Sequence, residues 1–475
     1  MSTEMKKPGA LPYDQLTALS SVDGRYRTAA EALVPYVSEY ALIKYRVHVE
    51  CEYFIALSEG NVGLREFTEK EKNALRRIAS DFSLDDARIV KKIEREGLGG
   101  RPATNHDVKA VEYLIKDKLL GTPLEKVSEW IHFGLTSEDV NSIAYGMMLR
   151  GALEEVLLPR FERARASLER LALENAAEPM LARTHGQSAS PTTFGKEIRV
   201  FERRLARQLL YLRSNAILVK LSGATGNYSA HLAGAPKSDW PAFARAFVAR
   251  LSDGYEIQLE LNEVTTQIEP HDTYAELFDC LRRVNTVLID LSQDMWRYIS
   301  DGWITQKPKE GEVSSSTMPH KVNPIDFENA EGNWGVSNAL FEHFSRKLPI
   351  SRLQRDLSDS TVERVIGTAF AHSLVGLSSL ERGLSKISVN APAMLSALAS
   401  HPEVLAEALQ SALRVAGVAV PYERLKELTR GREVTLGDFA AFIDSLDISD
   451  ELRARLKALR PENYIGLAER IARGD

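Results

Sequence analysis

The sequence predicts an all-α protein with a long central helical bundle. Long segments repeat apolar residues at steps of three and four, which is the period of one helix face. Alternating, strand-like segments are scarce, and the sequence holds neither a fixed-period repeat nor a low-complexity tract. A chain of 475 residues is also too long for one compact core, so several domains are expected.

The clearest helical stripe lies between residues 277 and 299, and two more occupy residues 153–171 and 198–212. Their apolar positions are Leu277, Leu281, Val284, Leu288, Leu291, Met295 and Ile299; Leu153, Leu157, Phe161, Ala164, Leu168 and Leu171; and Ile198, Phe201, Leu205, Leu209 and Leu212. Pro159 is expected to kink or restart the helix that contains it. Such helices must bury their stripes against one another or against a partner chain, which favours a bundle.

Breaks in these patterns suggest three domains. We expect an N-terminal helical domain over residues 1–126, a central bundle over 127–384 and a C-terminal helical domain over 385–475. The longest loop of the bundle, residues 307–324, holds three consecutive serines and several prolines. The segment from Tyr255 to Leu261 alternates weakly, and we expect it to form a small hairpin.

Composition excludes several classes of protein. A net charge of -6 argues against a nucleic-acid partner, which usually requires a basic excess. The N-terminal segment lacks the apolar core of a signal peptide, and no run approaches the ~18 apolar residues of a membrane helix. The sequence therefore favours a cytoplasmic protein without a membrane partner. Cys51 and Cys280 are expected to be buried apolar side chains, because two thiols this far apart do not make a disulfide framework.

Cofactor motifs are missing from the sequence. Residues 97–100 are glycine-rich but follow a charged, helix-like run, where a dinucleotide loop would follow a strand. Neither CxxC nor HExxH occurs. Glu269, His271 and Asp272 suggest a metal site, yet near-adjacent side chains rarely converge on one ion. We therefore expect neither a metal nor an organic cofactor.

Polar residues gather in separate segments along the chain. They are residues 105–107, 136–139, 183–187, 266–269 and 314–321. Each has an ordinary structural interpretation: residues 136–139 are typical of a helix N-cap with an acidic first turn, and His185 could be a hydrogen-bonded structural histidine. The serine run could be a flexible linker. However, the run Met318-Pro319-His320-Lys321-Val322-Asn323-Pro324 is too specific for a linker, and the polar residues after it are expected to begin a helix.

That run carries a family resemblance. SSTMPHKVNP, at residues 315–324, resembles the signature of the fumarase/aspartase superfamily. Within it, segments spread over nearly the whole chain resemble the adenylosuccinate lyase family. They are VDGRY at 22–26, TNHDVKAVEY at 104–113, HFGLTSEDVN at 132–141, RTHGQ at 183–187, TTQIEPHD at 265–272, QRDLSDSTVER at 354–364 and PYERLKELTRG at 421–431. In this sequence Ser314 replaces the glycine common before the first loop serine, and residues 97–102 resemble a short insertion.

The resemblance implies a three-domain fumarase/aspartase-like fold and a β-elimination. It implies release of fumarate from adenylosuccinate, giving AMP, and from the succinylaminoimidazole carboxamide ribotide, giving the aminoimidazole carboxamide ribotide. Ser315 matches the base, although Ser314 remains an alternative within the serine run. His185 matches the general acid, and a pKa of ~6.5 suits an imidazole to that task; His106 is the rival.

The remaining matches imply substrate contacts. Donors for the carboxylate that gains charge are Thr136, Ser137, Gln267, Lys321 and Asn323. Phosphate and ribose contacts match Arg25, Tyr26, Arg355, Ser360 and Arg364, while Asn105, His106 and Asp107 match substrate binding or orientation of the acid. Lys321 is also placed to stabilise a serine alkoxide. The superfamily further implies a homotetramer whose active sites are each assembled from three subunits.

Two alternatives remain at this stage. One is a lyase of the same superfamily acting on another succinyl-like substrate, against which the QRDLSDSTVER donor set argues. The other is a catalytically silent helical scaffold, against which the joint presence of Ser315, His185 and Lys321 argues.

Overall fold

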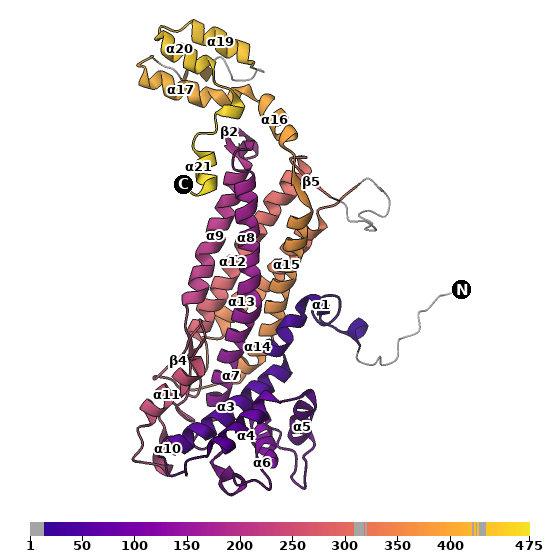
Figure 1. Cartoon of the computed structure of the whole chain (residues 1–475), viewed down its shortest axis with the longest axis vertical. Coiled ribbons are helices and arrows are strands. Elements are labelled where there is room, and N and C mark those ends of the chain that lie inside the picture. Colours follow the sequence, from indigo (N-terminus) through magenta and orange to yellow (C-terminus); the bar gives the residue numbers. More distant parts are fainter. Residues whose placement is uncertain (1–13, 308–317, 319–320, 420–421, 424, 427–433) are drawn as a thin grey trace, which may run out of the picture. The chain divides into compact units, whose positions relative to one another are not determined.

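A computed structural model describes residues 14–307, 318, 321–419, 422–423, 425–426 and 434–475 (Figure 1). The chain divides into two compact units. Unit 1 comprises Met1–Phe161, Gln208–Thr286 and Gly332–Ser378. Unit 2 comprises Glu162–Arg207, Val287–Glu331 and Ser379–Asp475. The predicted domain boundaries near residues 126 and 385 stay predictions.

Unit 1 is built mainly from helices. Its elements are η1 (Gln15–Thr17), α1 (Arg27–Ala30), η2 (Glu31–Leu33), α2 (Val34–Val37), α3 (Glu39–Glu59), α4 (Glu69–Ser80), α5 (Leu84–Arg95), α6 (Asp107–Lys118), η3 (Glu125–Trp130), α7 (Ser137–Gly151), the π-helix η4 (Ala152–Leu157), β3 (Ile217–Val219), α10 (Ser229–Gly234), α11 (Trp240–Ser252), β4 (Leu259–Leu261) and α14 (Ser358–Glu363).

Unit 2 contains short strands and the C-terminal helices. Its elements are β1 (Pro179–Thr184), β2 (Gln187–Thr193), β5 (Ile304–Gln306), β6 (Ile387–Val389), α16 (Ala391–Ala399), η5 (Pro402–Leu405), α17 (Ala406–Val415), α19 (Leu436–Asp444), α20 (Asp450–Lys457), η6 (Pro461–Asn463) and α21 (Ala468–Arg473). Several long helices contribute residues to both units: α8 (Leu158–Glu174), α9 (Phe194–Ser214), α12 (Asp272–Ser300), α13 (Ile325–Lys347) and α15 (Ile366–Lys386).

The predicted apolar stripes all lie on helices. The stripe at 277–299 falls within α12 and the stripe at 198–212 within α9, and their apolar positions are buried except Ile299, which is half-buried. The stripe at 153–171 spans the π-helix η4 and most of α8. The chain stays helical from α7 through η4 into α8, and α-helical hydrogen bonding resumes at Leu158, so Pro159 lies in the first turn of that α-helical segment, where its missing N–H is tolerated. The expected restart of a separate helix at Pro159 is therefore not observed.

Helix α3 forms the centre of unit 1. Its N-cap is Ser38, whose hydroxyl accepts a hydrogen bond from the amide of Ala41 at 3.1 Å. From Val49 to Ser58 every side chain is buried, and the helix packs against α4, α6 and α7. A helix covered on nearly all faces must pair any charge that it carries, and this decides the structure of the site.

Strands are short and pair in twos within the described residues. The expected hairpin over Tyr255–Leu261 is wrong, because β4 pairs in parallel with β3, and Leu259 lies opposite Ile217. A parallel partner some forty residues earlier in the chain leaves no local hairpin signal. The antiparallel hairpin of β1 and β2 was not expected from the sequence, since its second strand is mostly small and polar.

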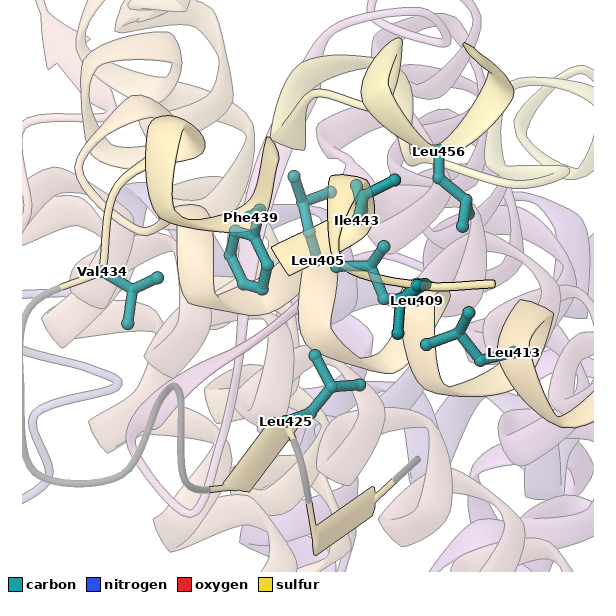
Figure 2. Close-up of a cluster of buried hydrophobic side chains, with 9 residues drawn as sticks. Leu405, Leu409, Leu413, Leu425, Val434, Phe439, Ile443 and Leu456 are labelled. Carbon is teal, nitrogen blue, oxygen red and sulfur yellow. The ribbon is translucent and has the colours of Figure 1, made fainter. Parts of the chain in front are cut away.

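The C-terminal helices of unit 2 have an apolar core of their own (Figure 2). It joins α17, α19 and α20 through the buried side chains of Leu405, Leu409, Leu413, Leu425, Val434, Phe439, Ile443, Leu446 and Leu456. The all-α prediction is thus confirmed, since the paired strands are only three to seven residues long. Both cysteines are buried and unbonded to each other, as expected. None of the helices in the described part of the chain is long and apolar enough to cross a membrane.

Candidate active site

Most of the predicted substrate-binding residues lie in unit 1. They are Arg25, Tyr26, Asn105, His106, Asp107, Thr136, Ser137, Gln267, Arg355, Ser360 and Arg364. His185, Lys321 and Asn323 lie in unit 2, and the proposed base Ser315 lies outside the described residues.

His106 and Ser137 are brought together by two helix N-termini. His106 is the N-cap of α6, and the amide of Lys109 donates to its Nδ1 at 3.2 Å. Since Nδ1 accepts there, a neutral ring carries its proton on Nε2, which lies 3.2 Å from the Ser137 hydroxyl. Ser137 begins α7 directly after its N-cap Thr136. The two residues therefore face a region where helix amides favour a negatively charged group.

Asp107 joins this region to Arg364. Its carboxylate lies 3.1 Å from the Arg364 guanidinium and 2.9 Å from that of Arg46 on α3. Burial alone would raise the pKa of Asp107, but the charges of the two arginines outweigh it and lower the pKa to about 2. Asp107 is thus a permanent anion that holds two cations at fixed positions.

Arg355 is held by buried carboxylates. Its guanidinium lies 2.8 Å from Glu138 of α7 and 3.7 Å from Asp359 of α14. Burial, followed by the charge of Glu363, raises the pKa of Glu138 to about 7. His271 lies 3.4 Å from Glu363, and although burial disfavours its charged form, that carboxylate keeps its pKa above the ordinary value. This part of unit 1 therefore combines buried acidic groups with an arginine and a buried histidine.

Cavities lie beside Arg364. One, of about 180 Å³, is lined by apolar residues of α3 and α7 and by Glu39, Tyr145 and Glu363. A second, of about 270 Å³, adjoins the same arginine and is lined in part by Asp23 and Arg27. Both place a concave surface next to a cation that sequence analysis expects to contact substrate.

Buried side chains contact the backbone segment that leads into Thr136. The amide of Thr136 donates to the Asp139 carboxylate at 2.8 Å, which confirms the predicted N-cap. Gly134 has φ +71°, and a Cβ there would lie 2.7 Å from the ring of His231. Tyr53 donates to the carbonyl of Phe133 at 2.9 Å, so its oxygen is left to accept from His231 Nε2 at 3.1 Å. The backbone before α7 therefore packs against the imidazole ring of His231.

His185 lies at the tip of the β1–β2 hairpin in unit 2. His185 and Gly186 form the two-residue turn, with φ of 54° and 76°. Positive φ at both positions is the requirement of a type I′ hairpin turn. The side chain of His185 is exposed, and Arg183 of the same hairpin lies over the Trp303 ring at 5.7 Å. The structure thus presents this imidazole to solvent at the tip of a tight turn.

The remaining predicted residues lie in both units. Lys321 is exposed, and its amide donates to the carbonyl of Met318 at 3.0 Å. Helix α13 begins at Ile325, directly after the signature run, as predicted. Arg25 is exposed, while Tyr26 lies edge-on to His372 with ring centroids 6.4 Å apart.

Four further predicted residues are described by their backbone or their burial. Asn105 has φ +48°, a conformation that asparagine tolerates. The amide of Ser360 donates to the Asp359 carboxylate at 2.6 Å. Gln267 is half-buried beside the buried Ile268. Asn323 is also half-buried. No group of three metal-ligating side chains occurs among the residues that the structure describes.

Sequence reasoning missed the buried partners of these residues. Arg46, Glu138, Lys220 and His231 were not singled out as site residues. Arg46 had a detectable signal, because a charge within the apolar run of α3 must be paired. The partners themselves carry no local signal, since they come from other helices.

Comparison with known proteins decides the family. A family model described as lyase matches residues 24–336, and one for the C-terminal region of adenylosuccinate lyases matches residues 351–465. Adenylosuccinate lyase from Escherichia coli K12 is 47% identical over 457 residues, which covers 95% of this chain and 97% of that protein. The enzyme of the same name from Dictyostelium discoideum is 48% identical, covering 96% of this chain and 97% of that one.

The chain belongs to the adenylosuccinate lyase family. Its fold also matches solved structures of more distant proteins. A fumarate lyase from Mesorhizobium sp. BNC1 has a TM-score of 0.70 at 18% identity, covering 94% of this chain and 97% of that one. The 3-carboxy-cis,cis-muconate lactonizing enzyme from Pseudomonas putida has a TM-score of 0.67 at 20% identity, covering 92% and 96%. The fumarase/aspartase-like fold predicted for this adenylosuccinate lyase family member is therefore confirmed.

Proposed function

We propose that the protein cleaves adenylosuccinate to AMP and fumarate, and cleaves the succinylaminoimidazole carboxamide ribotide in the same way. The observation that carries the proposal is the identity of 47–48% to adenylosuccinate lyases over nearly the whole chain. The site geometry is consistent with it, because Arg355 and Arg364 give unit 1 two cations suited to a phosphate.

In the proposed mechanism Ser315 removes a proton from the carbon beside a succinyl carboxylate. Negative charge spreads onto that carboxylate, and donors such as Thr136, Ser137 and Gln267 stabilise it. Lys321 stabilises the serine alkoxide. The leaving nitrogen then takes a proton from His185 as the carbon–nitrogen bond breaks. The exposed position of His185 at a hairpin tip supports this role, because its ring is open to an incoming substrate.

His106 has a different proposed role. Its Nδ1 is engaged by a backbone amide and its Nε2 faces the Ser137 hydroxyl. An imidazole held at both nitrogens is suited to orienting a donor, and it is less suited to protonating a leaving group. We therefore assign His106, with Asn105 and Asp107, to substrate binding.

We further propose that the active enzyme is a cytoplasmic homotetramer with shared active sites. Leu210 of α9 is 66% exposed and Val336 of α13 is 47% exposed, although both lie on long helices. Gly332 and Gly335 of α13 have open space where a Cβ would stand. Glycine costs about 1 kcal/mol in a helix interior, so two exposed glycines fit a face that another helix approaches closely.

Purified protein should convert adenylosuccinate, which is followed by the change in purine absorbance, and should sediment as a tetramer. Cleavage of argininosuccinate without cleavage of adenylosuccinate would overturn the substrate assignment. Shared sites have a separate test, in which inactive His185→Ala and Ser315→Ala proteins are dissociated, mixed and reassembled. If acid and base come from different subunits, the mixture regains activity; if both come from one chain, it stays inactive.

A further inference from the structure

A polar network with a buried centre connects the two arginines that are expected to bind phosphate. In order, it runs Arg364, Asp107, Arg46, Asn141, Glu138 and Arg355. Each step is a direct contact: 3.1 Å from Arg364 to Asp107, 2.9 Å from Asp107 to Arg46, and 2.8 Å from Arg46 Nε to the Asn141 amide oxygen. The Asn141 amide group then donates to Glu138 at 2.7 Å, and Glu138 lies 2.8 Å from Arg355.

Arg46 is the central member of the polar network and is almost completely buried, with 3% of its surface exposed. A buried guanidinium is costly unless its charge is paired and its N–H groups are bonded. Arg46 meets both conditions with one fork, since Nε donates to Asn141 and a terminal nitrogen donates to Asp107. Its burial also keeps it from touching a substrate, so its effect has to pass through its partners.

The members of the polar network lie on rigid elements. Arg46 belongs to α3, Asp107 begins α6, and Glu138 and Asn141 lie on the first turns of α7. Arg355 and Arg364, in contrast, flank the short helix α14. Long arginine side chains lose rotamer entropy when they bind a ligand, so anchoring them before substrate arrives strengthens binding.

Arg46 also changes the charge available for binding. A lone Asp107–Arg364 pair would largely cancel the charge of Arg364. Because Arg46 shares the same carboxylate, more of the positive charge of Arg364 remains for an incoming anion.

We propose that Arg46 is a positioning residue that fixes the spacing and orientation of Arg355 and Arg364 for the phosphate of the substrate. The proposal rests on the function proposed above. It makes a specific prediction: loss of Arg46 weakens binding of the phosphate and leaves binding of the rest of the substrate unaffected.

The test compares ligands with and without the phosphate. Competitive inhibition constants of AMP and adenosine are measured against adenylosuccinate cleavage. The ratio of the two constants gives the contribution of the phosphate to binding. In Arg46→Met the constant for AMP should rise by about tenfold to a hundredfold, as expected when binding groups are displaced by an ångström. The constant for adenosine should stay close to that of the wild type, because adenosine has no phosphate. Arg46→Lys should show a smaller rise, because an ammonium can hold Asp107 but cannot also reproduce the planar fork to Asn141.

The matched control is Arg250→Met. Arg250 is also an arginine of unit 1 that pairs with a carboxylate, Glu59 at 2.8 Å, but it lies outside the polar network. Its AMP to adenosine ratio should equal that of the wild type. If Arg46→Met does not fold, the AMP to adenosine ratio is measured in Arg46→Lys and Asn141→Ala instead. Each of these variants breaks one step of the polar network.

The outcomes separate the two proposals. A wild-type protein that does not cleave adenylosuccinate overturns the proposed function. A wild-type protein that does cleave it, with Arg46 variants that leave the AMP to adenosine ratio unchanged or weaken both ligands equally, overturns the positioning role alone.

Discussion

The ammonium of Lys220 lies 2.5 Å from the carboxylate of Asp139, and neither side chain is exposed to solvent. The same carboxylate accepts hydrogen bonds from the amides of Ser222 and Gly223 at 2.8 and 3.2 Å. Lys220 in turn donates to the carbonyl of Gly223 at 2.7 Å. This pair therefore ties the segment after β3 to the first turn of α7, where Thr136 and Ser137 lie.

Removal of one member of this pair should be strongly destabilising. In Lys220→Met the Asp139 charge stays buried without its cation, and we expect a loss of roughly 3–5 kcal/mol in the free energy of unfolding. Denaturant titration measures it. The double variant Lys220→Met with Asp139→Asn should recover part of the loss, because the amide keeps an acceptor for the backbone. Equal stability of the wild type and Lys220→Met would contradict the assignment.

His231 should make the protein sensitive to acid. Burial lowers the pKa of His231 to about 4, and its Nδ1 has no hydrogen-bond partner among the described residues. The unfolded chain takes up a proton near pH 6.5, before the folded protein does, so stability should fall as pH drops from about 6.5 to 4. The loss is on the order of 3 kcal/mol, and above about pH 7 His231 contributes no pH dependence.

Unfolding titrations at pH 7 and pH 4.5 test this, with His231→Gln as the comparison. The variant should lose less stability than the wild type over that interval. Glu138, with a pKa raised to about 7, contributes in the opposite direction over this interval, but it titrates in both proteins and cancels in the comparison. Asp107, with a pKa of about 2, contributes only below about pH 4. Identical slopes in the two proteins would show that His231 is not the acid-sensitive group.

Gly134→Ala should be damaging for two separable reasons. Its φ of +71° strains an alanine, and the new Cβ would lie 2.7 Å from the His231 ring. We expect a loss of roughly 2–5 kcal/mol. Gly121→Ala is the matched control, since Gly121 has φ +75° but nothing within 4 Å of its Cβ position. It should show backbone strain only, so thermal unfolding that ranks the two variants equally would rule out the clash.

Substitution of the proposed acid and base should abolish turnover without unfolding. His185→Ala should lose about 10²- to 10⁴-fold in kcat, the usual contribution of a general acid. Ser315→Ala should be inactive, and Ser314→Ala should retain activity. Steady-state kinetics beside circular dichroism distinguishes these cases. An inactive Ser314→Ala with an active Ser315→Ala would shift the loop register by one residue.

Local patterns in the sequence predicted helices well and pairings poorly. The stripe that lies on α12 repeats at the three- and four-residue spacing of one helix face, so the sequence exposes it directly. Pairing of β3 with β4 depends on two segments forty residues apart, and that is why the expected hairpin failed. The turn at His185 was hidden for a different reason: its motif suggested chemistry, while its backbone geometry is that of a tight hairpin.

The candidate site shows the same difference between local motifs, which the sequence reveals, and long-range contacts, which it does not. Asp107 and Arg364 could be nominated from motifs, but their mutual contact comes from residues 257 positions apart. Arg46 could be recognised only as a charge in an apolar helix, and its two partners are separated from it by 61 and 95 residues. Tertiary packing selects those partners.

The polar network has an evolutionary consequence. Because the geometry of two surface arginines is set by Arg46, Asn141 and Glu138 in the interior, these positions cannot drift independently. We expect homologous sequences to keep the set intact or to replace several members together. An engineer who wishes to change the ligand of this scaffold would accordingly have to redesign part of its core as well as the walls of its pocket.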